Sequence, residues 1–144
     1  MNRILFDNMA YMGILANLLN TQDPNPNYGQ EVVYLNTGTL ELVIVGDPEI
    51  ASSANNMTKE EYMADIESFI NEDLAKDDRW MVLLPISDEE WDQVYRQWLA
   101  ESEGYIKFMP LDALSFHERQ DWNVKRRDYS HEKAEELINQ YRNT

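Results

Sequence analysis

The stretch from Arg79 to Trp98, RWMVLLPISDEEWDQVYRQW, constrains the fold more than any other part of the chain. Its first half is a short continuous apolar run over residues 80 to 84, which predicts a central β-strand covered on both faces. Pro85 follows at once and has no amide hydrogen to give to a neighbouring strand, so the strand is predicted to stop there.

An amphipathic helix is predicted directly after the proline. Ser87 is the expected N-cap, and Glu90 has the spacing of its capping-box partner. The apolar residues that follow recur at three- and four-residue steps, which places them on one helical face. They include two of the chain's four tryptophans, and a third lies in the strand. We therefore expect this unit to be the hub of the core, with an inner helical face of Trp91, Val94, Tyr95 and Trp98.

The N-terminal part of the chain predicts one helix, one loop and one hairpin. Apolar residues spaced along residues 3 to 20 predict the helix, and residues 20 to 29 form a loop rich in asparagine and proline. An α+β body is expected from residue 30 to residue 144. It opens with a hairpin over residues 31 to 45, in which Gly38 is predicted to take a positive φ in the turn.

Helices dominate the rest of the predicted body. A loop is expected over residues 46 to 57, and a second capping box at its end opens a helix over residues 58 to 74. Further helices are predicted over residues 111 to 122 and, with Ser130 as its cap, up to about residue 142. Residues 105 to 108 fit either a short strand or an extended link.

These elements predict the fold class. A chain of 144 residues corresponds to a single domain. The element order indicates an α+β fold, with a small and mostly antiparallel sheet packed by four to five helices. We expect the sheet to consist of the hairpin 31–45 and the strand 80–84.

Negative charge is concentrated in the middle of the chain. The net charge is −15, and residues 31 to 103 hold 18 acidic residues against four basic ones. Such a field repels nucleic acid and anionic membrane surfaces, whose phosphates need cationic side chains. It attracts basic protein surfaces, although the same charge would also serve to keep a small protein in solution.

Composition and the N-terminal residues indicate a cytoplasmic protein. The chain has no cysteine, so it has no disulfide framework and no thiolate metal site. The first residues lack the features of a secretion signal, because Asp7 interrupts the apolar stretch and no small-residue cleavage site follows.

No catalytic signature is recognisable. There is no Gly-x-Ser-x-Gly elbow, and the glycines are too few and too scattered for a phosphate loop. His117 and Asp121 have the i, i+4 spacing of helical metal ligands, but a zincin requires a second histidine at the later position. A partly exposed histidine beside a surface acid is the simpler explanation of this pair. We predict no catalytic, cofactor-binding or metal-binding residue.

Three longer segments follow one another in a recognisable order: YLNTGTLELVIVGDPE, WMVLLPISDEE and FMPLDALSFHERQDWNVKRRDYSHEKAEELI. Their order resembles small bacterial proteins grouped as uncharacterised protein family 158. The resemblance covers residues 30 to 140 and implies a hairpin, a strand leading to an acidic helix start, an aromatic and basic run and a final helix. It implies no activity, cofactor or site residue.

The leading functional hypothesis is a non-enzymatic protein-binding module that presents an acidic surface to a basic partner. In a sharper form, the carboxylates mimic nucleic acid and inhibit or regulate a nucleic-acid-binding protein, so that no nucleic acid or membrane is bound directly. One alternative is an enzyme or ligand-binding domain with a metal-assisted carboxylate site. Another is a homo-oligomeric accessory protein with Trp122 or Tyr129 at its interface. The predicted partner surface consists of Glu60, Glu61, Asp65, Glu67, Glu72, Asp73, Asp88, Glu89 and Asp92.

Overall fold

The computed structural model describes residues 1–20, 31–102 and 109–142, and it confirms the α+β class. Most of the predicted Asn- and Pro-rich loop and the segment 105–108 lie outside these residues. The described chain forms two compact units. Unit 1 combines residues 1–11, 31–84 and 137–142, and unit 2 combines residues 12–20, 85–102 and 109–136.

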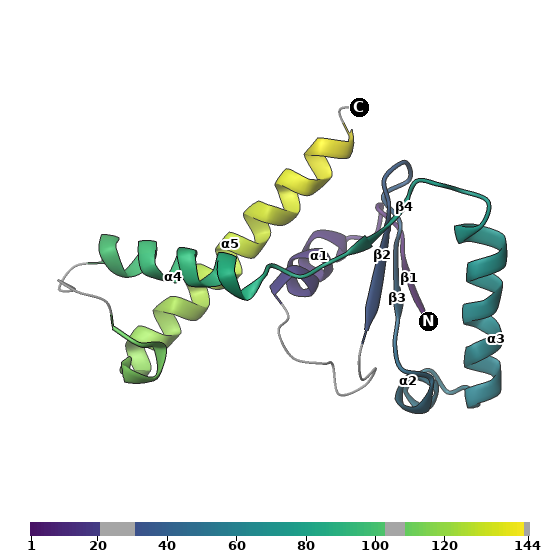
Figure 1. The fold of residues 1–144 in the computed structure, drawn as a ribbon, viewed down its shortest axis with the longest axis horizontal. Helices are drawn as coiled ribbons and strands as arrows, with labels where there is room; N and C mark the ends of the chain where they lie inside the picture. The colour runs from purple at the N-terminus through teal and green to yellow at the C-terminus, as the bar shows by residue number, and fades with distance from the viewer. Residues whose placement is uncertain (21–30, 103–108, 143–144) are drawn as a thin grey trace. The chain divides into compact units, whose positions relative to one another are not determined.

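Unit 1 contains a four-stranded antiparallel sheet (Figure 1). The strand order is β1-β3-β2-β4, so the hairpin β2–β3 forms the middle of the sheet. The predicted hairpin and the predicted strand after Arg79 are confirmed. The strands are β1 (Asn2–Ile4), β2 (Val32–Asn36), β3 (Leu42–Val45) and β4 (Trp80–Leu83).

One face of this sheet is covered by α3 (Lys59–Phe69), which continues as a π-helical turn, η1 (Ile70–Leu74). Phe69 is buried and lies against Tyr34 of β2 and Trp80 of β4, with ring centroids 5.4 and 5.2 Å away. The predicted capping box is confirmed, because Thr58 and Glu61 exchange hydrogen bonds at the start of the helix. This anchoring leaves the opposite side of α3 exposed to solvent (Figure 1).

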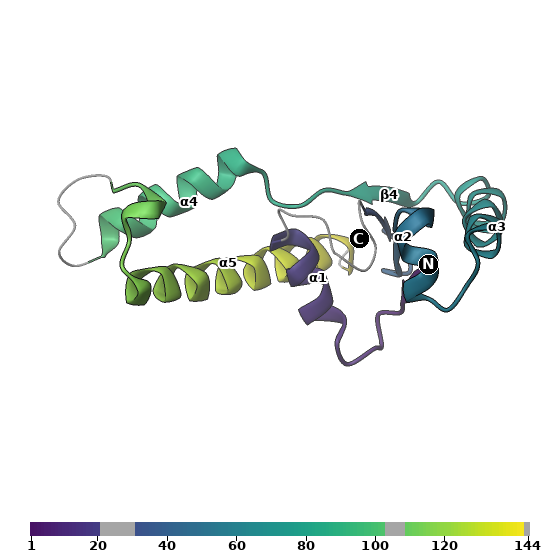
Figure 2. The ribbon, with the colours of Figure 1, turned by 90° about the horizontal axis from the view of Figure 1, so that it is seen from below.

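Unit 2 is built on the pairing of α4 (Asp88–Glu101) with α5 (Phe116–Arg142), whose residues up to 136 belong to this unit (Figure 2). A short 3₁₀ helix, η2 (Leu111–Ala113), precedes α5. The predicted inner face of α4 is largely confirmed, although Trp98 is only partly buried. The buried core consists of Trp91, Val94, Tyr95, Leu99, Leu114 and Trp122.

The predicted N-terminal helix is wrong in its first half. Residues 2 to 4 form β1, and α1 (Tyr11–Asn20) begins only at residue 11. Asn8 closes a turn between them, because its carbonyl accepts from the Tyr11 amide at 3.0 Å and its side chain accepts from the Ala10 amide at 2.9 Å. Local asparagine bonding of this kind competes with a helix, and pairing with β3 satisfies the backbone of the first residues.

The hairpin turn takes its positive φ at Leu40, with φ 67°, and not at the predicted Gly38. A leucine in this conformation costs about 1–2 kcal/mol. Its side chain is buried, and the buried Tyr11 hydroxyl donates to the Leu40 carbonyl at 2.5 Å. Burial and this hydrogen bond hold a conformation that the sequence pattern does not indicate. Strand β3 consequently begins at Leu42, two residues later than expected.

The predicted loop at 46–57 contains a helix, α2 (Pro48–Ala54). Asp47 is its N-cap, with a side chain that accepts from the Glu49 amide at 2.9 Å, and Pro48 occupies the first turn. Aspartate followed by proline is a known helix start, because proline there loses no hydrogen bond. Asp47-Pro48-Glu49 carries this signal in the sequence, although residues 46–57 are predicted as a loop.

Strand β4 is an edge strand and not the central strand that its apolar run predicted. It pairs with β2 alone among the described strands. Val82 is 49% exposed, and Leu84, just beyond the strand, is 74% exposed. The continuous apolar run therefore predicted the strand correctly, but the prediction that both faces of the strand are covered was wrong.

The two C-terminal helices predicted from the sequence are one helix, α5. Ser130, the expected cap, is buried inside it, and its hydroxyl donates to the Arg126 carbonyl at 2.8 Å. A serine that bonds the carbonyl four residues earlier does not interrupt a helix. At its start, Ser115 and Glu118 exchange hydrogen bonds, so α5 begins at Phe116 and not at Leu111.

Candidate functional site

The nine predicted partner-surface residues fall into two groups. Unit 1 carries six of them, on α3 and η1, and unit 2 carries three, at the start of α4. All except Asp65 and Asp73 are exposed, and those two are half-buried. The first group is Glu60, Glu61, Asp65, Glu67, Glu72 and Asp73, and the second is Asp88, Glu89 and Asp92.

Three acids of the first group have structural roles. Asp65 lies 3.5 Å from the N-terminal ammonium group, and Asp73 forms an ion pair with Arg3 of β1. Glu61 accepts from the Thr58 amide at 3.0 Å in the capping box. Asp65 and Asp73 attach α3 and η1 to other parts of unit 1, and Glu61 closes the start of α3 itself, so all three are less suited to an external partner.

The remaining acids of α3 share its outer side with exposed apolar residues. Met63 is 50% exposed and Ile70 is 47% exposed, although both belong to a helix that packs on a sheet. Glu60 and Glu67 are exposed and form no ion pair within the described residues. Successive steps of three and four residues align these four side chains along one helical side. We call Glu60, Met63, Glu67 and Ile70 the α3 stripe.

The second group of acids is explained largely by helix chemistry. Asp88 and Glu89 lie in the first turn of α4, where the helix dipole favours negative charge. Asp92 pairs with Arg96 one turn later, at 2.9 Å. The predicted capping box is half formed. Ser87 accepts from the Glu90 amide, while the Glu90 carboxylate accepts from Tyr129 at 2.5 Å and from Lys133 at 3.1 Å.

Glu90 thereby links α4 to α5. The hydrogen bond from the Tyr129 hydroxyl, together with Lys133, lowers the pKa of the Glu90 carboxyl despite its partial burial. The homo-oligomer hypothesis places Trp122 or Tyr129 at an exposed interface. Tyr129 is half-buried, and Trp122 is 4% exposed in the aromatic core, so Trp122 is not available for an interface.

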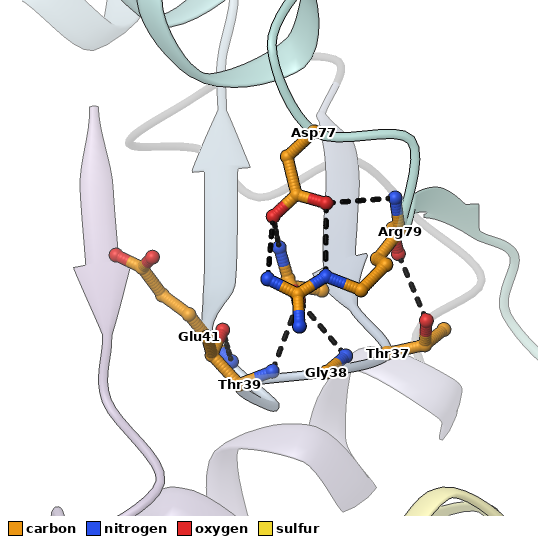
Figure 3. A network of polar contacts seen from close by, with 7 residues as sticks. Thr37, Gly38, Thr39, Glu41, Asp77 and Arg79 are labelled. Carbon is orange, nitrogen blue, oxygen red and sulfur yellow. Dashed lines mark hydrogen bonds and ion pairs between the residues drawn. The ribbon is translucent and has the colours of Figure 1, made fainter.

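A polar network that the sequence did not reveal lies at the turn of the hairpin (Figure 3). The Asp77 carboxylate accepts two hydrogen bonds from the Arg79 guanidinium, both at 2.9 Å, and one from Asn36 at 3.0 Å. The side-chain oxygen of Asn36 in turn accepts from the amides of Gly38 and Thr39. The network fastens the turn to the start of β4.

Gly38 is required in this network for close approach. A β-carbon at this position would lie 2.1 Å from Nη1 of Arg79, so any side chain would displace the guanidinium from Asp77. The carboxylate oxygens of Asp77 are occupied by Arg79 and Asn36, which leaves them poorly placed to bind a cation. We interpret the network as structural.

The Asp77 network predicts a pH-dependent contribution to stability. Hydrogen bonds from the Arg79 side chain and amide and from Asn36 hold the pKa of the Asp77 carboxyl well below its usual range. Because the pKa is lowered in the folded protein, the stabilisation is complete above the ordinary aspartate pKa of about 3.9 and decreases as the pH falls below it. Asp77→Asn is therefore expected to lower the urea midpoint at neutral pH.

The difference between the wild type and Asp77→Asn should shrink as the pH is lowered from 5 toward 2, as measured by urea unfolding followed by circular dichroism. Asp78→Asn is the matched control, because Asp78 is exposed and makes no described hydrogen bond. Equal effects of the two substitutions at every pH would contradict a specific role for the network.

No group of metal ligands is found among the described residues. Within residues 1–20, 31–102 and 109–142, no three His, Cys, Asp or Glu side chains are close enough together to hold a metal ion. His117 and Asp121 both lie on α5, and His117 is exposed beside the Phe116 ring. The helical spacing of this pair is thus confirmed, but no third ligand accompanies it in the part of the chain described.

Neither a protein-family model nor a curated protein nor a solved structure matches this chain. The resemblance to uncharacterised protein family 158 therefore remains an expectation from the sequence. Among the described helices, none combines the length and the apolar character needed to cross a membrane.

Proposed function

We propose that the protein is a non-enzymatic module that binds a basic protein partner through the α3 stripe, in the cytoplasm. The observation that carries this proposal is the exposure of Met63 and Ile70 between the exposed carboxylates of Glu60 and Glu67. Solubility alone would explain exposed acidic residues. It does not explain two exposed apolar side chains in line with them.

The stripe has the composition of a small docking surface. Protein interfaces combine an apolar centre with a polar rim, and methionine is enriched at their centres. In the stripe, Met63 and Ile70 supply the apolar contacts, and Glu60 and Glu67 supply charge that steers a basic partner. The same charge disfavours a second copy of the chain, because two acidic stripes would repel each other.

Charge spacing favours a basic protein that carries its own apolar residues over the nucleic-acid-mimic form of the hypothesis. Glu60 and Glu67 are seven residues apart, which corresponds to about 10 Å along the helix. Duplex DNA carries about one charge per 1.7 Å of its axis. The two carboxylates of the stripe are therefore much farther apart than the phosphate charges along a DNA duplex. Other acids on this side of unit 1 include Asp65 of α3 and Asp73 of η1, and both are paired within the unit.

The proposal predicts that a double substitution in the stripe abolishes partner binding. Glu67→Lys with Met63→Ala reverses one charge and removes one apolar contact. It should spare the fold, because both residues are exposed and lysine is favourable near a helix C-terminus. Capture of partners from a lysate of the native host, at low and high salt, should recover a basic protein that is lost at high salt and lost with the variant.

A matched control is Glu135→Lys with Val124→Ala on α5, because both residues are exposed and the change in charge is the same. Binding that survives the stripe variant, or that is lost equally with the control, would refute the proposal. Charge reversal at Asp88 and Glu89 is a poorer test, since lysine there would oppose the helix dipole of α4.

A further inference from the structure

Unit 2 contains a pocket that the acidic-surface proposal does not use. Its volume is about 410 Å³, within the range of small-molecule sites. It opens beside the first half of α5, on the side of η2, so both lining elements belong to the same unit. The residues that line it are Leu111, Asp112, Arg119, Trp122, Asn123 and Arg126.

Two arginines give this pocket a local positive charge in a chain whose net charge is −15. Arg119 and Arg126 are seven residues apart on α5, which is about two helical turns, so they lie on the same side of the helix. Asn123 lies between them and adds an amide group. Guanidinium groups present a planar fork of N–H donors that matches a carboxylate.

Arg126 is held in a defined orientation. One of its terminal nitrogens donates to the Asn20 carbonyl at 3.1 Å, and its guanidinium lies 4.5 Å from the centre of the Trp91 ring. Partial burial lowers the pKa of Arg126, and the nearby Asp88 acts in the opposite direction. A partly desolvated cation of fixed orientation gains more from an anion than an exposed one does.

Arg119 is the exposed member of the pair and is anchored at one point. It donates one hydrogen bond to the Asp112 carbonyl, at 3.0 Å. A guanidinium carries five N–H donors, so Arg119 has donors beyond the one used within the described residues. Asn123 is exposed, and its side chain makes no hydrogen bond that the described residues account for.

Trp122 lines the pocket from within the aromatic core of unit 2. Trp122 is buried to 4% exposure and lies edge-on to Trp91 and Tyr95, with centroids 6.2 and 5.0 Å away. Leu111, 48% exposed, supplies a second apolar surface. Aromatic and aliphatic walls with a few placed polar groups are typical of sites that bind a ring-bearing ligand.

Two buried polar atoms next to Arg126 lack partners within the described residues. They are the side-chain oxygen of Asn20 and the indole nitrogen of Trp91. Asn20 contacts Arg126 through its carbonyl, and Trp91 contacts it through its ring. Buried polar groups are rarely left unpaired, and an ordered water or ion is one explanation for those that are.

We propose that this pocket binds a small monocarboxylate that carries a flat apolar ring. The carboxylate lies between the guanidinium groups of Arg119 and Arg126, and the ring lies against Trp122 and Leu111. Asp112 also lines the pocket, and its carboxylate disfavours a doubly charged phosphate more than a singly charged carboxylate.

Isothermal titration calorimetry on the full chain tests the proposal with phenylacetate, phenylacetamide and phenyl phosphate. Phenylacetate is expected to bind with a Kd at or below about 1 mM. The neutral amide and the phosphate ester should each bind at least tenfold more weakly. In ¹H–¹⁵N NMR spectra, the indole signal of Trp122 should shift with phenylacetate along the same saturation curve.

Arg119→Ala should weaken phenylacetate binding at least tenfold without unfolding the protein, because Arg119 is exposed. Arg127→Ala is the matched control on the same helix, since Arg127 lies outside the pocket and pairs only with Asp128 in the described ion pairs. The proposal is wrong if phenylacetate does not bind, if the amide or the phosphate ester binds as well, or if the two arginine variants lose affinity equally.

Discussion

Trp91→Ala is expected to lower the free energy of unfolding by about 3–5 kcal/mol, the usual cost of removing a buried large aromatic side chain. Trp91 is 4% exposed, and its ring contacts those of Trp122 and Tyr129. It also lies under the guanidinium of Arg126, so its loss would leave a partly buried charge over a cavity. Urea unfolding followed by near-ultraviolet circular dichroism measures the change.

Trp98→Ala is the control for this prediction. Trp98 lies on the same helix and in the same aromatic cluster, but it is only partly buried. It should therefore cost less than half as much as Trp91→Ala. If the two substitutions cost the same, burial would not be the cause, and the interpretation of Trp91 as the centre of the unit 2 core would fail.

Phe69→Ala is expected to destabilise unit 1 by a similar amount, about 3–5 kcal/mol. Phe69 is 2% exposed between Tyr34 and Trp80, and the Arg3 guanidinium lies 5.3 Å from its ring centre. Its two ring contacts join the end of α3 to β2 and β4. Amide hydrogen exchange should show β2 and β4 losing protection, together with a lower urea midpoint.

Phe116→Ala removes the same side chain from a position that is 72% exposed. It should change the free energy of unfolding by less than about 0.5 kcal/mol, as surface substitutions usually do. A cost for Phe116→Ala that approached the cost for Phe69→Ala would contradict the assignment of Phe69 to the core.

Local patterns predicted those parts of the fold that depend on neighbouring residues. The capping box of Thr58 and Glu61 and the inner face of α4 are encoded within a few residues of each other, and both are confirmed. The start of α2 was encoded equally locally, in Asp47 and Pro48, so that error was one of interpretation.

Other features depend on contacts between distant residues. The positive φ of Leu40 is held by Tyr11, 29 residues away, and the edge position of β4 depends on which strand it pairs with. The candidate sites show the same division. The sequence predicted that the acids of α3 lie on a helix. Which of them form ion pairs and which remain in the exposed stripe depends on the positions of Arg3 and the N-terminus.

In the sequence, Arg126 of the pocket belongs to a short basic run with Lys125 and Arg127, a pattern that is typical of solvated side chains. Arg127 fits that interpretation, because it is exposed and pairs with its neighbour Asp128. Arg126 does not, because it stacks on Trp91 and bonds the backbone of Asn20, 106 residues away. The sequence pattern alone does not show that these two adjacent arginines have different partners, because the partners of Arg126 are distant in the chain.

The division of the chain between the two units has a consequence for the order of folding during synthesis. Unit 1 takes its last segment from residues 137–142, where the Tyr141 hydroxyl lies 3.5 Å from the sulfur of Met81. Apart from residues 12–20, which are made earlier, unit 2 is translated between β4 and this segment. A ribosome-bound chain can therefore bury the core of unit 2 first, while the earlier-made sheet waits for the final turns of α5 to complete its packing.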